Sequence, residues 1–140
     1  MSTFREDLEK GKIAEKEALR LIQKDYPEAY IKEGYCKGFD IAIPELGWTL
    51  EVKLDSLYKT YGNLFIENTC NKKPSGIETT TADGWYIFYD EDDLSKIKKI
   101  RTKTLREMIK NNNYTNKFGG EPNNVTTGYT IPIGEFKWKS

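Results

Sequence analysis

The sequence predicts an α+β or α/β fold in which one helix precedes a mixed central β-sheet flanked by helices. Three observations lead to this prediction: an opening stretch with apolar residues at helical spacing, a following group of short alternating stretches, and a second half of mixed elements. The chain has 140 residues, of which 37% are hydrophobic and 31% charged. That length and composition predict one domain, over residues 1–140, with a modest core.

The first helix is expected from about Thr3 to Lys24. Thr3 and Glu6 have the spacing of a capping box, and Asp25-Tyr26-Pro27 ends the helical pattern. Apolar residues recur at helical spacing: Phe4, Leu8, Ala14, Ala18, Leu21 and Ile22. A first strand is plausible over residues 29–33.

Two alternating stretches, residues 39–43 and 48–54, predict a β-hairpin with the four-residue loop 44–47. If the loop is symmetric, the numbers of paired residues sum to 91, so that Ile43 faces Trp48 and Asp40 faces Glu51. Farther along, the sequence predicts a strand over 63–69, a capped helix from Ser75 to about Ala82, and a strand over 85–89.

The last third of the chain is partly ambiguous. Residues 94–100 fit a helix, and they fit equally well a short strand followed by a helix capped near Thr102. A helix over 103–111 is the firmer expectation. The Asn- and Gly-rich residues 111–124 predict a mobile loop, and residues 127–133 a closing strand.

Composition excludes several chemistries. The sequence contains no histidine, which excludes Ser-His-Asp and Cys-His catalysis as well as His-ligated zinc. Two cysteines make no disulfide framework and favour a reducing cytoplasm. No apolar stretch approaches the ~20 residues that cross a bilayer, and the charged start lacks the apolar core of a secretory signal. We therefore expect no membrane partner, and chemistry based on carboxylates, lysines and hydroxyls.

The hairpin brings two carboxylates together. Directly opposed side chains on antiparallel strands lie close, and like charges there repel, so Asp40 opposite Glu51 favours a bound divalent cation such as magnesium. Lys53 projects from the same face as Glu51. A half-exposed hairpin with one wet face would give the same alternation without any function.

Glu15 adds a third carboxylate to this interpretation. It follows Gly11 by four residues and precedes Ala18 by three, on the predicted apolar stripe, where an ionised side chain is costly unless it is paired. Glu17 is the alternative candidate for this third carboxylate, but it has basic neighbours and is expected to be solvated. Gly11 costs about 1 kcal/mol within a helix, which suggests close approach of another group at that turn.

These residues resemble a known motif. Gly38-Phe39-Asp40, followed after a gap by Glu51-Val52-Lys53, resembles the signature of the PD-(D/E)xK nuclease superfamily, with Phe39 where the proline would stand. The run 11–17 resembles the first-helix motif of archaeal-type Holliday-junction resolvases in that superfamily. Residues 73–85 look similar to small phage-encoded nucleases of the same group. The resemblance implies a restriction-endonuclease-like core and a magnesium-dependent DNA endonuclease, with manganese as a substitute ion.

The resemblance also implies residue roles. Asp40 and Glu51 would hold the ion with the backbone carbonyl of Val52, and Glu15 would ligate through water or bind a second ion. Lys53 would orient or deprotonate the attacking water and hold the scissile phosphate. No small-molecule cofactor is implied. Cleavage of a four-way junction would require two coordinated cuts and thus a homodimer. The small size suits a virus-encoded enzyme acting in the host cytoplasm.

Basic residues supply candidates for DNA contacts. Residues 94–117 contain eight bases and one acid, a net charge of +7, which is compatible with a polyanion-binding face and equally with a solvated basic surface. The candidates are Lys72, Lys73, Ser75, Lys98, Lys99 and Arg101. Glu67 alternates with Phe65 and could face the site, but it is interpreted as a surface residue. Two other functions stay open: a general or restriction-type nuclease acting on linear duplex, and a non-catalytic nucleic-acid-binding module.

Overall fold

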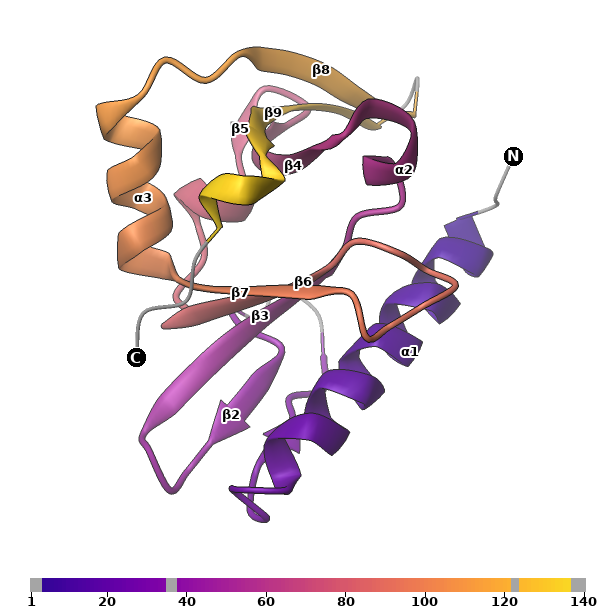
Figure 1. Cartoon of the computed structure of the whole chain (residues 1–140), viewed down its shortest axis with the longest axis vertical. Helices are drawn as coiled ribbons and strands as arrows, with labels where there is room; N and C mark the ends of the chain where they lie inside the picture. The colour runs from indigo at the N-terminus through magenta and orange to yellow at the C-terminus, as the bar shows by residue number, and fades with distance from the viewer. Residues whose placement is uncertain (1–3, 35–37, 122–123, 137–140) are drawn as a thin grey trace.

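The fold is α+β, as predicted, and consists of an N-terminal helix and two β-sheets with further short helices (Figure 1). The computed structural model describes residues 4–34, 38–121 and 124–136. Helix α1 (Phe4–Gln23) lies on one side of the first sheet, and the second sheet and α3 (Thr102–Asn111) lie on the other (Figure 1). Residues 1–3, the start of the predicted capping box included, lie outside the described residues.

The first sheet has five strands in the order β1-β2-β3-β6-β7, and only β3 and β6 are parallel. Its strands are β1 (Tyr30–Ile31), β2 (Ile41–Ile43), β3 (Trp48–Leu54), β6 (Gly84–Phe88) and β7 (Ile97–Arg101). The predicted hairpin is confirmed, because β2 and β3 flank the loop 44–47 and Ile43 pairs with Trp48. The sum of 91 holds for all three pairs of this ladder.

A second sheet was not predicted. It has four antiparallel strands in the order β5-β4-β9-β8: β5 (Lys73–Pro74), β4 (Asn63–Cys70), β9 (Asn124–Pro132) and β8 (Asn116–Glu121). The predicted mobile loop over 111–124 is wrong, since β8 pairs with β9 from Asn116↔Tyr129 onward. Pairing with a strong partner strand overrides the weak strand propensity of Asn and Gly, as context commonly does in sheets.

Two uncertain segments are resolved by the structure. Residues 97–101 form β7 and α3 follows at once, so the strand-then-helix alternative is the right one for this region. The helix expected from Ser75 to Ala82 is wrong, because only a single 3-10 turn, η1 (Gly76–Glu78), forms there. The Ser75 side chain does not cap that turn; its hydroxyl donates instead to Glu67 at 2.8 Å. The remaining short helices are α2 (Tyr58–Tyr61) and η2 (Ile133–Glu135).

Alternation along β3 divides its side chains between two cores. Leu50 and Val52 are buried in the cluster that contains Ala14 and Ala18 of α1. Glu51 and Lys53 point to the opposite face, because they pair with Trp85 and Ile87, which belong to the cluster beneath the second sheet and α3. Glu51 and Lys53 therefore lie on the face of the first sheet opposite to α1. Within the described residues, no helix has the length and apolar character needed to cross a membrane.

Candidate active site

Glu51 and Lys53 form the centre of the candidate site. Lys53 Nζ lies 3.2 Å from Glu51 Oε1, and the Glu51 side chain is 16% exposed against 45% for Lys53. The ammonium also lies over the indole ring of Trp85, 5.9 Å from the ring centroid. The sequence-predicted pair on one face of β3 is thus in direct contact and partly shielded from water.

Asp40 lies immediately beside this pair. The β2–β3 ladder ends at Ile41, and the Asp40 N–H donates to the carbonyl of Leu50 at 2.8 Å instead of continuing the predicted pairing with Glu51. The Asp40 side chain then turns to β3, where Oδ2 accepts the N–H of Val52 at 2.8 Å. Asp40 is therefore anchored to the residue between Glu51 and Lys53.

Glu67 also belongs to this site, and its interpretation as a surface residue is corrected. It is half-buried on β4 and lines a cavity of about 210 Å³ together with Lys53 and Trp85. Ser75 holds its Oε2 by a hydrogen bond of 2.8 Å. The alternation of Glu67 with Phe65 was the one sequence signal, and it did not identify the element that would face this strand.

The carboxylates determine the charge state of Lys53. Burial disfavours the ammonium, but the nearby carboxylates of Glu51, Asp40 and Glu67 outweigh it and raise the pKa of Lys53 above its ordinary value. Lys53 is consequently protonated at neutral pH and acts as a fixed positive charge in the site.

Glu15 is not brought into this group. It is half-buried on α1, next to Ala14, and α1 packs on the face of β3 opposite to Glu51 and Lys53. The buried stripe of α1 consists of Ala14, Ala18 and Ile22, whereas Leu8 is 49% exposed. Across the ranges that the structure describes, no three Asp, Glu, Cys or His side chains form a metal-ligand cluster.

The expectation for Gly11 was also wrong. A Cβ atom placed on Gly11 would meet no atom within 4 Å outside its own helix, so none of the other described segments approaches this turn closely. The turn lies toward the less buried end of α1, where Ile13 is 57% exposed. Gly11 therefore gives no support to a site at this end of the helix.

The donor set fits magnesium. Magnesium prefers oxygen ligands, keeps several waters, and is commonly held by one or two carboxylates together with substrate phosphates. Asp40, directly before β2, and Glu51 on β3 offer such carboxylates side by side. Trp85 Nε1, buried beside them, donates no hydrogen bond to any part of the chain that the structure describes, and buried donors of this kind are uncommon in folded proteins.

The first group of DNA-contact candidates lies at the turn between β4 and β5. Lys72 and Lys73 are exposed there, and Asn71 and Lys72 have φ values of 50° and 67°. Ser75 is turned to Glu67. The expected phosphate site at a capped helix N-terminus is wrong, because η1 spans only three residues and lacks the side-chain cap.

The second group of DNA-contact candidates lies on β7, and its side chains do not all project from the same face of the sheet. Lys99 lies over the ring of Tyr86 at 5.0 Å and Arg101 over that of Trp48 at 5.4 Å. Lys98, one position away, points to the opposite face of β7 and pairs with Ile87. Lys98 and Lys99 therefore cannot contact one DNA backbone from the same face of the sheet.

Comparison with known proteins gave no relative: no protein-family model, no curated protein and no solved structure matches this chain.

Proposed function

We propose that the protein is a magnesium-dependent DNA endonuclease that hydrolyses phosphodiester bonds. One observation supports this most strongly: Asp40, Glu51 and Lys53, separated along the chain, meet on one face of the first sheet. Two carboxylates with an adjacent lysine suit phosphodiester hydrolysis without histidine, since a bound metal ion neutralises charge on the phosphate and activates water.

The residues take the following roles. Asp40 and Glu51 hold magnesium, or manganese in its place, with the carbonyl of Val52 as a further oxygen donor. Lys53, protonated because its pKa is raised, binds the scissile phosphate and orients the attacking water as a point charge. Glu67 holds the ammonium of Lys53 in position from the second sheet. Glu15 has no role in this proposal, because α1 packs on the opposite face.

The resemblance to junction resolvases makes a four-way junction the first substrate to test and a homodimer the expected assembly. We place the activity in the cytoplasm, as the two cysteines favour. Cleavage of linear duplex as well as junctions would identify a general nuclease. Binding of DNA without cleavage would support the non-catalytic module.

The test is cleavage of a labelled four-way junction and of a linear duplex of the same sequence, with magnesium and with chelator. The parent protein should cut the DNA with magnesium and not with chelator, and Glu51→Gln should abolish this cleavage. Glu33→Gln, an exposed residue outside the site, is the matched control and should cut like the parent. Equal cleavage by Glu51→Gln and the parent would refute the metal-site assignment.

A further inference from the structure

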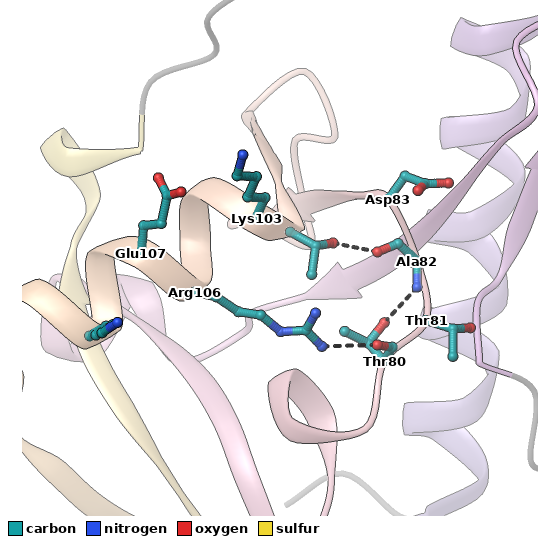
Figure 2. A pocket seen from close by; sticks show the side chains of 9 residues that line it. Thr80, Thr81, Ala82, Asp83, Lys103, Arg106 and Glu107 are labelled. Carbon is teal, nitrogen blue, oxygen red and sulfur yellow. Dashed lines mark hydrogen bonds between the residues drawn. The ribbon is translucent and has the colours of Figure 1, made fainter.

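A second depression, of about 440 Å³, lies between α3 and the segment before β6 (Figure 2). From α3 come two lysines, an arginine and a glutamate, and from the other wall come two threonine hydroxyls and an aspartate. The lining side chains include Thr80, Thr81, Asp83, Lys103, Arg106, Glu107 and Lys110. The three basic residues of the depression belong to the basic stretch 94–117 that the sequence offers for polyanion contacts, whereas the threonines of the other wall were not identified from the sequence.

Two of the three cations that α3 contributes have no partner among the described residues. Lys103, Arg106 and Lys110 recur at helical spacing on one face of the helix. Within the described chain, Lys103 and Lys110 form no hydrogen bond or ion pair. Asp83 is already hydrogen-bonded, because its Oδ2 accepts the N–H of Thr49 at 2.8 Å and the hydroxyl of Thr49 at 3.2 Å. Two uncompensated ammonium groups thus border the depression.

Arg106 fixes the opposite wall. Its guanidinium points to that wall (Figure 2) and donates to the carbonyls of Ile77 and Thr80, both at 3.0 Å. The wall is therefore held to α3 by charge-assisted hydrogen bonds to two of its carbonyls, and such bonds are stronger than neutral ones.

The same wall reaches the candidate active site. The hydroxyl of Thr80 and the N–H of Thr81 both donate to the carbonyl of Gly38, at 3.3 and 3.1 Å. Gly38 precedes Asp40 by two residues. The wall of the depression therefore contacts the short segment that leads to Asp40.

We propose that this depression binds a further backbone phosphate of the DNA that is cut at Asp40 and Glu51. Lys103 and Lys110 supply the charge, and the exposed hydroxyl of Thr81 supplies a donor of the kind that commonly contacts DNA phosphates. Such a contact positions the strand without reading its sequence. The inference rests on the proposed function for the identity of the ligand. Glu107, beside Lys103 on the rim (Figure 2), weakens the attraction.

The test measures DNA binding by the full chain in chelator over a range of salt concentrations, by fluorescence anisotropy with a labelled duplex and a labelled junction. Each phosphate contact by a lysine contributes about one unit to the slope of log affinity against log salt. Lys103→Gln with Lys110→Gln should therefore weaken binding and reduce the slope by about one, because one phosphate contact is lost. Lys16→Gln with Lys24→Gln, which removes two exposed charges of and beside α1, should leave the slope unchanged.

A charge change in the opposite direction provides a second readout. Glu107→Gln should tighten DNA binding, and this exposed substitution remains informative if the lysine double variant fails to fold. An unchanged slope in a folded lysine variant, or unchanged affinity in Glu107→Gln, would overturn the inference.

The outcomes separate this inference from the proposed function. Cleavage that depends on Glu51, combined with an unchanged salt slope, would refute the phosphate contact and leave the nuclease intact. A reduced slope in a protein that does not cut DNA would refute the nuclease and retain the phosphate contact.

Discussion

Asp40 Oδ2 accepts the backbone N–H of Val52 at 2.8 Å, and this bond joins β3 to the segment preceding β2 where their ladder has ended. Val52 lies between Glu51 and Lys53. Because one oxygen of Asp40 binds this N–H, the carboxylate is held beside the other two side chains. The same group therefore has a structural role and, in the proposed function, a metal-binding role.

Substitutions of Asp40 should separate these two roles. Asp40→Ala leaves the buried N–H of Val52 without its acceptor and should lower the free energy of unfolding by about 1–3 kcal/mol. Asp40→Asn retains an acceptor oxygen and should lose less stability, yet cleavage should fall about 100-fold or more because the negative charge is lost. Urea denaturation and cleavage rates measure the two effects. Full cleavage by Asp40→Asn would exclude a metal-binding role for the carboxylate.

Glu51→Gln should lower the pKa of Lys53. The raised folded-state pKa means that the folded protein binds this proton more tightly than the unfolded chain does. The resulting stabilisation is complete below the ordinary lysine pKa and is lost as pH rises through the raised value. As pH rises through this alkaline range, the free energy of unfolding should fall less steeply for Glu51→Gln than for the parent protein. NMR titration of the Lys53 side chain and unfolding at several alkaline pH values check this, with Lys16, exposed on α1, as the reference lysine.

Glu67→Gln should also lower the pKa of Lys53, but less than Glu51→Gln, because Glu67 acts on the ammonium more weakly than Glu51 does. The amide can still accept from Ser75, so the position of the side chain is preserved. Cleavage should fall about 10-fold or more, as expected when a group that orients a site is changed. Glu78→Gln, exposed on η1, serves as the control. Wild-type cleavage by Glu67→Gln would return Glu67 to a purely structural role.

Gly38→Ala should disturb the segment that leads to Asp40. A Cβ at this position would collide with the Thr81 hydroxyl oxygen and lie 3.1 Å from the Thr81 Cβ, so the Thr81 side chain or the segment that carries it must shift. Overpacking of this kind costs about 1–3 kcal/mol. Thr81→Ala removes the closest atom, and the double variant should recover part of the loss. A double-mutant cycle in urea measures the coupling, and strict additivity would contradict the contact.

Asp55 should be a major stabilising residue at the edge of the cavity. Its carboxylate accepts the N–H groups of Phe65, Leu57 and Tyr58, at 2.8, 3.0 and 3.1 Å, and so ties β3 to α2 and β4. Asp55→Ala should lower the free energy of unfolding by at least about 1–3 kcal/mol, the cost of leaving one such group unsatisfied. The stability of Asp55→Asn should fall between that of the parent protein and that of Asp55→Ala, since the amide keeps one acceptor oxygen. Identical stabilities of all three proteins would show that these bonds are exchanged for water without cost.

The local features of the site could be predicted from the sequence. Alternation with period two assigned Glu51 and Lys53 to one face of β3, and the four-residue loop set the register of the hairpin. The strand before α3 was one of two open alternatives. A short apolar pattern such as residues 94–100 fits both the helical and the strand spacing of apolar residues. Only the pairing of β7 with β6 shows that the strand forms.

The tertiary structure decided which elements cover each face. Periodicity shows that Glu15 borders an apolar stripe and that Glu67 alternates with Phe65, but it does not show what packs against either residue. α1 packs on the Leu50 face of β3, whereas the second sheet brings Glu67 to the face of Lys53. That sheet depends on the pairing of β4 with β9, whose residues are some sixty positions apart. Contacts at such separation depend on the folding of the whole chain, and no local pattern encodes them.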